Sequence, residues 1–270
     1  MDVRAVRDTS GWYQLPAVRD MASIQFGQSR CQIEGTVVPV ADVLLDGGES
    51  VFFSHHVLLW RDDGVSVQSM SMRQAWKRML AGMPLVMCQA TGRGHIAFSE
   101  DAAGEVIALP IHPGTGVQVR EHTMLIASGV TAYDWEPSGI WFTTIQRKGN
   151  ETERETHYPL GQFLDRFSAA QAPGLVLLHA KGNSFVRSLA PGETIMIKPT
   201  ALLYKDLSVS IHLHFEHPAN TWRSWRSWGD RYLWLRCQGP GRVAVESAFA
   251  PVEDPGYDLV ASSPATRQQW

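Results

Sequence analysis

The residues with the clearest chemical pattern lie between positions 222 and 228, where tryptophans and arginines alternate. The set is Trp222, Arg223, Trp225, Arg226 and Trp228. Indole rings stack on nucleobases, and guanidinium groups pair with phosphates or carboxylates. Both residue types are also enriched at protein–protein contacts and at membrane interfaces. We therefore expect this stretch, called the Trp/Arg segment below, to be a binding surface that has no catalytic role.

Three kinds of partner fit the Trp/Arg segment. The first is another copy of the chain, which predicts a homo-oligomer, or a protein partner of unknown identity. The second is nucleic acid, but a formal net charge of −3 gives no electrostatic support for a dedicated nucleic-acid binder. The third is peripheral contact with a membrane surface. No run in the sequence approaches the roughly 18 apolar residues of a spanning helix.

A second pattern is the pair His212 and His214, in a segment that alternates apolar and polar residues from 206 to 216. Side chains alternate across a strand, so both histidines and Glu216 are predicted to share one face. Two imidazoles and a carboxylate could bind a metal ion. However, the pattern also fits the solvated face of an amphipathic strand, and the glutamate that cupin barrels place several residues later is missing. We therefore expect no metal and no cofactor here.

Motifs of the common enzyme classes are missing from the sequence. It has no phosphate-binding loop, no G-x-S-x-G elbow, no H-E-x-x-H and no dinucleotide fingerprint. The sequence therefore favours a non-enzymatic scaffold or interaction protein. The alternatives are a small-ligand or nucleic-acid binding module, and a metal-dependent β-barrel enzyme that uses the two histidines.

Composition and cysteine usage indicate a folded chain from a reducing compartment. Of 270 residues, 44% are hydrophobic and 19% are charged, which is enough apolar material for a large core. Cys31, Cys88 and Cys237 are odd in number and far apart, so we predict that they are unbridged. The N-terminus lacks the apolar core of a secretory signal, and we expect a cytoplasmic protein.

Short runs of β-branched and aromatic residues, separated by glycine, proline and aspartate, predict an all-β fold. We expect β-sandwich or double-stranded β-helix-like units with two short helices. The helices are predicted at residues 71–81 and 160–170, because apolar residues there have helical spacing and a proline follows each segment. The charged segment 146–157 is predicted to be an exposed loop.

Internal repetition suggests how these units are organised. Three segments share the order of apolar run, glycine, strand, and a Gly-Glu pair that opens another strand. The pairs are Gly48-Glu49, Gly104-Glu105 and Gly192-Glu193. We expect a flexible segment over residues 1–20, a single domain of repeated β units over 21–250, and a frayed tail over 251–270.

These segments also carry a family resemblance. GRGHIAF, LLHAKGNSFVRSLAPGETI and the closing GPGRVAVES follow one another in an order that resembles the altered inheritance of mitochondria 24 family, from Cys31 to Phe249. The resemblance implies a fold similar to that of the tryptophan RNA-binding attenuator protein, and a biochemical activity that is largely undefined. No tryptophan-binding or RNA-binding residue can be transferred, because no motif of that protein is matched.

Overall fold

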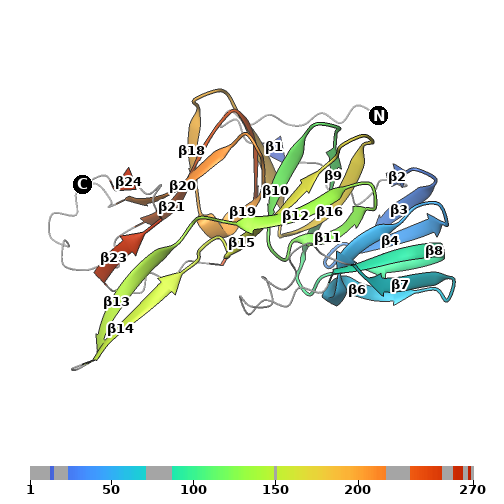
Figure 1. Cartoon of the computed structure of the whole chain (residues 1–270), viewed down its shortest axis with the longest axis horizontal. Helices are drawn as coiled ribbons and strands as arrows, with labels where there is room; N and C mark the ends of the chain where they lie inside the picture. Colours follow the sequence, from blue (N-terminus) through green and yellow to red (C-terminus); the bar gives the residue numbers. More distant parts are fainter. Residues whose placement is uncertain are drawn as a thin grey trace.

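The structure is a computed structural model that describes residues 13–14, 24–70, 87–148, 151–216, 232–250, 258–263 and 267–268. Within these residues β-strand is the main secondary structure (Figure 1). The helical turns found there are two 3-10 turns, η1 (His55–Val57) and η2 (Pro199–Ala201). The predicted all-β fold is therefore confirmed. No helix in the described ranges is long and apolar enough to cross a membrane.

Two large antiparallel sheets form most of the molecule. In spatial order, the seven-stranded sheet contains β1 (Tyr13–Gln14), β17 (Ser184–Leu189), β22 (Gly241–Glu246), β19 (Leu202–Asp206), β10 (Gly116–Arg120), β15 (Phe163–Ser168) and β12 (Ala132–Pro137). The ten-stranded sheet contains β2 (Ile24–Phe26), β3 (Ser29–Glu34), β4 (Val40–Asp46), β8 (Met87–Phe98), β5 (Val51–Ser54), β11 (Met124–Ser128), β16 (Gly174–Lys181) and β9 (Gly104–Ile111), with β6 (Leu58–Arg61) and β7 (Val65–Ser69) also paired to β8.

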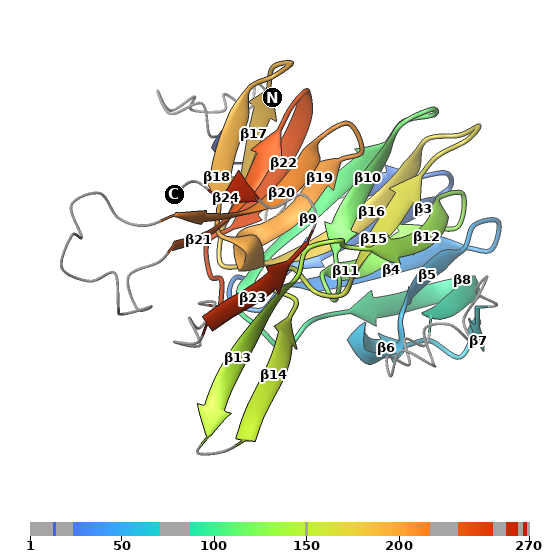
Figure 2. The same ribbon diagram turned by 60° about the vertical axis from the view of Figure 1, so that its left-hand side comes forward.

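Two smaller sheets lie against the seven-stranded sheet. The four-stranded sheet contains β18 (Thr194–Ile197), β21 (Tyr232–Gln238), β20 (Ser210–Glu216) and β24 (Arg267–Gln268). The three-stranded sheet contains β14 (Glu151–His157), β13 (Phe142–Lys148) and β23 (Asp258–Ser262). The β13–β14 hairpin projects away from the rest of the chain (Figures 1 and 2).

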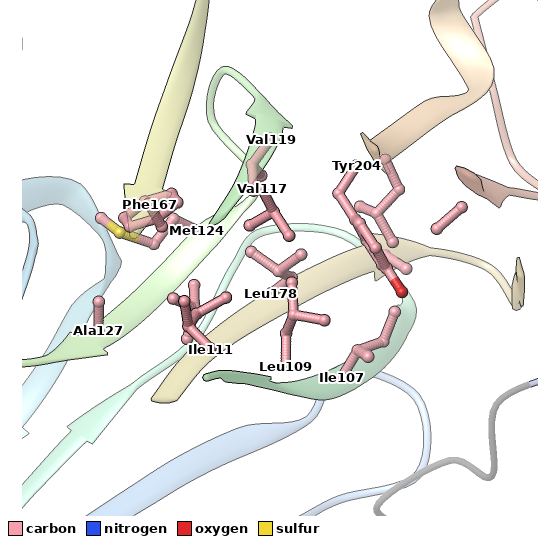
Figure 3. Close-up of a cluster of buried hydrophobic side chains, with 14 of the residues drawn as sticks. Ile107, Leu109, Ile111, Val117, Val119, Met124, Ala127, Phe167, Leu178 and Tyr204 are labelled. Atoms are coloured by element: carbon pink, nitrogen blue, oxygen red, sulfur yellow. The ribbon is translucent and has the colours of Figure 1, made fainter. Parts of the chain in front are cut away.

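The main core lies between the two large sheets. Leu109 and Leu178 from the ten-stranded sheet meet Val117, Phe167 and Tyr204 from the seven-stranded sheet (Figure 3). All five side chains are buried. Burial of this apolar surface is the main favourable contribution to the free energy of folding, at roughly 25 cal/mol per Å².

Two further cores complete a layered arrangement. The ten-stranded sheet curls so that its β3–β4 side packs on strands β5, β11 and β16, with Phe53 against Phe98 at a ring-centroid distance of 4.8 Å. The third core lies on the other face of the seven-stranded sheet, where Leu164 and Leu202 meet Leu235 of the four-stranded sheet. The seven-stranded sheet is therefore a middle layer with apolar cover on both faces.

The predicted helix over residues 160–170 is wrong. Residues 163–168 form β15, which pairs with both β10 and β12. Leu164 contributes to the third core, and Phe167 contributes to the main core on the opposite face. A strand buried on both faces loses the alternation of apolar and polar residues, and its pattern then resembles a helix. The other predicted helix, residues 71–81, lies outside the described residues.

Two boundaries also differ from the sequence analysis. Residues 146–148 and 151–157 of the charged segment 146–157, predicted to be a loop, belong to strands β13 and β14, and the charged residues of β14 protect an open sheet edge. The alternating segment 206–216 is a strand only from Ser210, because Val209 donates its backbone N–H to the Asp206 carbonyl at 3.1 Å and closes a turn.

In the C-terminal tail, predicted to be frayed, residues 258–262 form β23 and pair with β13. Ser263 is buried next to them. Fraying therefore does not describe this part of the tail. The division into a flexible start, one repeated domain and a tail stays a prediction in its other parts.

The glutamates of the three Gly-Glu pairs have the same role in the structure. Each carboxylate accepts a hydrogen bond from a backbone N–H outside a regular strand pairing. Glu49 accepts from Gln28 at 2.7 Å and Glu105 from Ser184 at 3.1 Å, while Glu193 accepts at 2.9 Å from the N–H three residues before it. These bonds satisfy amides that the sheets leave unpaired. Whether the three segments superpose as repeated units stays a prediction.

Candidate functional site

The Trp/Arg segment lies outside the described residues, so the structure does not place Trp222, Arg223, Trp225, Arg226 or Trp228. The strands on either side of it are described. The chain leaves β20 at Glu216 and returns in β21 at Tyr232, so the segment connects two neighbouring strands of the four-stranded sheet. That sheet is the first candidate site.

One face of the four-stranded sheet packs on the third core, and the opposite face carries aromatic side chains. The Lys198 ammonium lies 4.4 Å from the centroid of the Trp234 ring and 5.1 Å from that of Tyr232. The two rings are themselves 5.9 Å apart. Partial burial lowers the pKa of Lys198. Tyr232 is 47% exposed and Met196 of β18 is 37% exposed, so this aromatic face is open to a partner.

The two histidines predicted to share a face do lie on this same face of the sheet. His214 pairs with Trp234 across the strands, and the Glu216 carboxylate accepts a 2.8 Å hydrogen bond from the Trp234 indole. His214 is only 5% exposed, so at this position the face is not solvated as predicted. Among the described residues no three His, Cys, Asp or Glu side chains are arranged to hold a metal ion.

A second candidate site, which the sequence analysis did not identify, is a cleft of about 840 Å³ at one end of the two large sheets. Six separate parts of the chain line it: η1 with β6, the β8–β9 loop, the β10–β11 turn, the residues before β15, the end of β16 and the end of β22. Its ionisable side chains are His56, Glu100, Asp101, Arg120, Glu121, His122, His179, Lys181 and Glu246.

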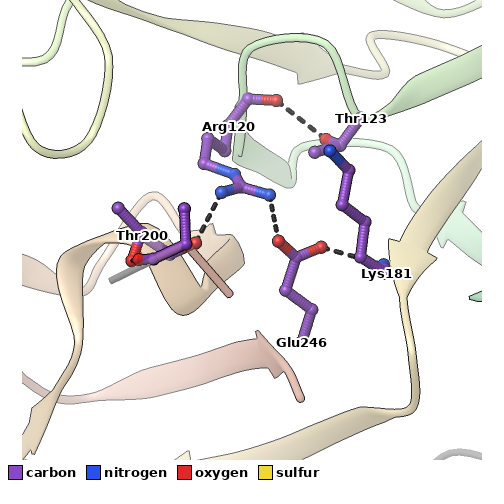
Figure 4. Close-up of polar contacts among 6 residues, drawn as sticks. Arg120, Thr123, Lys181, Thr200 and Glu246 are labelled. Carbon is purple, nitrogen blue, oxygen red and sulfur yellow. Dashed lines mark hydrogen bonds and ion pairs between the residues drawn. The ribbon is translucent and has the colours of Figure 1, made fainter. Parts of the chain in front are cut away.

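An ion pair between Arg120 and Glu246 holds the floor of the cleft together (Figure 4). The Arg120 guanidinium also donates to the backbone carbonyl of Thr200, and Glu246 Oε2 accepts from the backbone N–H of Lys181 at 3.0 Å. Glu246 is 2% exposed. Burial raises the pKa of Glu246, and Arg120 opposes part of that rise. The pair thus joins β10 to β22 at the floor of the cleft.

A cluster of ionisable groups lies at the mouth of the cleft. The Nδ1 atom of His56 is 2.8 Å from Ser54 Oγ, and its Nε2 atom is 3.7 Å from Glu100 Oε1. Burial, followed by the charges of His122 and His55, lowers the pKa of His56. Burial and the neighbouring Asp101 raise the pKa of Glu100. Both shifts favour the neutral forms of these side chains.

Among the described residues other than glycine, His122 is the one with a positive φ, at +62°. It lies in the β10–β11 turn, where its ring centroid is 6.0 Å from that of His56. A left-handed backbone costs free energy for a residue with a side chain, and such positions are concentrated at functional sites. The turn therefore holds the imidazole over the cleft in spite of that cost.

His179 of β16 is the most buried histidine that lines the cleft, at 3% exposure. Its ring is hydrogen-bonded to the backbone carbonyl of Ala102, and its Nε2 atom has no hydrogen-bond partner within the described part of the chain. Burial lowers the pKa of this imidazole, which favours its neutral form. A neutral ring that donates through the other nitrogen presents a lone pair at Nε2.

Sequence reasoning missed this cleft because its residues have no local pattern. They are spread from position 56 to position 246 in short groups that lie far apart in the sequence. The useful signal was the histidines and acids that follow apolar strands, such as His122 after β10 and Glu100 after β8, which the topology brings to one end of the sheets.

A sequence model of one family, Mitochondrial biogenesis AIM24, matches residues 31–248 of the chain. The chain belongs to the AIM24 family. The predicted resemblance is therefore confirmed, and the biochemical function of AIM24 proteins is undefined. No curated protein matches the chain.

Among solved structures, this AIM24 protein is similar to protein SPYM3_0169 from Streptococcus pyogenes. The two chains are 15% identical, with a TM-score of 0.59 over 82% of this chain and 94% of that one. At this identity the likeness shows the fold alone.

The GPGRV stretch that contributed to the AIM24 resemblance has a structural role. Gly241 has φ +133°, and a Cβ on Gly239 would lie 2.5 Å from the Ala190 carbonyl. Arg242 then binds both carboxylate oxygens of Asp206, at 3.1 and 3.0 Å. This stretch fixes the turn from β21 to β22 against the end of β19, and it supplies no binding group to either candidate site.

Proposed function

We propose that this AIM24 protein is a non-enzymatic interaction protein that assembles with further copies of itself through the aromatic face of its four-stranded sheet. The observation that carries the proposal is the exposed Tyr232 beside Trp234, with Lys198 stacked on both rings. Aromatic residues and cations of this kind are enriched in the centres of protein interfaces.

The surroundings of this face support the same function. Strand β18, at the edge of the sheet, pairs with β21 on one side, and its four residues carry no charge. Sheet edges that avoid association usually carry charges or proline. The Trp/Arg segment lies in the connection between two strands of this sheet, and it adds three tryptophans that each bury on the order of 200 Å² when covered. A second copy would supply that cover.

Sedimentation velocity over a range of protein concentrations tests the proposal. We expect the parent chain to sediment as a dimer or larger, and both Tyr232→Ser and Trp225→Ala/Trp228→Ala to shift toward monomer with unchanged circular dichroism. Trp60→Ala removes an exposed tryptophan from β6 of another sheet and serves as the matched control. A parent that stays monomeric would refute the proposal. Binding to lipid vesicles that these variants lose would favour the membrane alternative.

The proposed compartment is the cytoplasm. Cys31, Cys88 and Cys237 are all unbridged in the structure, as predicted, and Cys31 and Cys237 are buried. Free thiols persist in reducing compartments, which supports this location. Fractionation of cells that express a tagged full chain tests it.

A further inference from the structure

We propose that the cleft between the ends of the two large sheets binds an alkyl ammonium group, with the ammonium at Glu100 and His179 and the alkyl chain along Leu58 and Leu59. This inference does not depend on the proposed function, because the cleft and the aromatic face share no residue.

The first argument is a pair of hydrogen-bond acceptors without donors. His179 Nε2 and Glu100 Oε1 are both buried, and neither has a hydrogen-bond partner among the described residues. Buried polar atoms are nearly always paired, and leaving one unpaired costs about 1–3 kcal/mol. A ligand that only donates hydrogen bonds suits acceptors of this kind, and a primary ammonium has three N–H donors and no acceptor.

Gly104 lets β9 pass close to β16 beside the His179 ring. A Cβ at this position would lie 2.0 Å from the Ala180 carbonyl oxygen and 3.0 Å from His179 Nε2. The ring itself is held in place by its bond to the Ala102 carbonyl. The acceptor is therefore fixed in orientation and stays buried.

The second argument is charge. Arg120 is paired with Glu246, so it contributes little net field to the cleft. The other acidic side chains that line the cleft are Glu100, Asp101 and Glu121, and its other lysine or arginine is Lys181. Carboxylates are in excess, and a cation entering a cleft of this kind is attracted to it.

The third argument is the apolar wall beside these groups. Val57, Leu58, Leu59, Pro159 and Leu160 line the same cleft, and Leu59 is 52% exposed. An alkyl chain of several methylene groups can lie along such a surface while its charged end reaches the carboxylates. Free diamines and lysine side chains of a partner protein share this chemistry.

Ligand affinity is expected to fall in acid, because protonation of the carboxylates and the imidazoles both oppose a bound cation. The titratable or charged groups that face the cleft from the six parts of the chain that line it are His56, Glu100, Asp101, Arg120, Glu121, His122, His179, Lys181 and Glu246. Burial raises the pKa of Glu100, so loss of its charge begins at a higher pH than for an exposed glutamate.

Isothermal titration calorimetry on the full chain tests the proposal with 1,5-diaminopentane, a short peptide with one lysine, and pentanoate as the anionic counterpart. We expect both amines to bind saturably and pentanoate not to bind. Stronger binding of the diamine would identify a free amine as the source of the group, and stronger binding of the peptide would identify a protein partner.

Two variants locate the site. Glu100→Gln removes the carboxylate charge and should weaken amine binding about tenfold or more, the loss expected for a hydrogen bond to a charged group. Lys181→Met removes the competing ammonium and should strengthen it about threefold. Glu155→Gln, on the exposed hairpin strand β14, is the matched control and should leave the amine affinity unchanged.

Failure of both amines to bind the parent chain would overturn the proposal. So would pentanoate binding that Lys181→Met abolishes, since that result would make the cleft an anion site. If circular dichroism shows that Glu100→Gln does not fold, the increase in amine affinity expected for Lys181→Met still tests the proposal. The oligomer mass is measured separately, so either proposal can fail while the other stands.

Discussion

Replacing Arg120 with methionine should destabilise the protein and make its stability depend more steeply on pH. The side chain of Glu246 is 1% exposed and that of Arg120 is 18% exposed, so this substitution leaves the more buried partner without its counter-ion. Removal of one partner from a buried ion pair costs about 3–5 kcal/mol. The backbone N–H of Lys181 still donates to Glu246, so we expect a loss near 3 kcal/mol at neutral pH.

The pH dependence follows from the carboxyl group. Burial already raises the pKa of Glu246 in the folded state, and the loss of Arg120 raises it further. A carboxyl group whose pKa is higher in the folded state favours folding below its unfolded-state pKa, and this contribution is lost as pH rises through the folded-state pKa. The cost of Arg120→Met should therefore be small near pH 5 and largest near pH 8, given an unfolded-state pKa of about 4.3.

Urea unfolding followed by tryptophan fluorescence at both pH values measures this cost. The control is Arg120→Met/Glu246→Met, which removes both charges and should recover most of the lost stability. A cost for Arg120→Met that is equal at the two pH values, or a double variant less stable than Arg120→Met alone, would show that the ion pair does not hold the floor of the cleft.

Three further predictions concern the cores, a close backbone contact and the cysteines. Leu178→Ala should lower the free energy of unfolding by about 2–5 kcal/mol in urea titrations, because it opens a cavity in the main core. Gly92→Ala should lower the melting temperature while Gly48→Ala leaves it unchanged, since Gly92 has φ +112° and its new Cβ would lie 2.2 Å from a backbone carbonyl, whereas nothing lies within 4 Å of Gly48. Thiol titration of the folded chain at mildly alkaline pH should modify Cys88 first, because burial raises the pKa of the other two thiols to about 12, and all three should react once the chain is unfolded.

The all-β fold could be predicted from the sequence because most strands are short apolar runs that end in glycine, proline or aspartate. The helix prediction over 160–170 failed for a physical reason. Strand β15 belongs to a middle layer, so Leu164 faces one core and Phe167 the other. A sequence does not reveal how many sheets will cover a strand, and period-two patterning disappears when both faces are covered.

The two candidate sites also differ in how far the sequence could predict them. The pairing of His214 and Glu216 on one strand face follows from alternation alone, and the structure has both on the same side as Trp234. The cleft could not be predicted, because His56, Glu100 and His179 come together only through long-range strand pairing. Its strongest clue, an acceptor without a donor at His179, exists only in three dimensions.

The order of strands in the middle layer has a consequence for how the chain folds. No two neighbours in the seven-stranded sheet are consecutive in the sequence, so the layer contains no hairpin that could form early. Strand β10 can form its pairings only after β15 and β19 have been synthesised, and β19 can pair with β22 only after β22 has been synthesised. Such a high contact order predicts slow folding. On the ribosome the layer cannot close until Glu246 has emerged, so the earlier strands expose an aggregation-prone surface through most of synthesis.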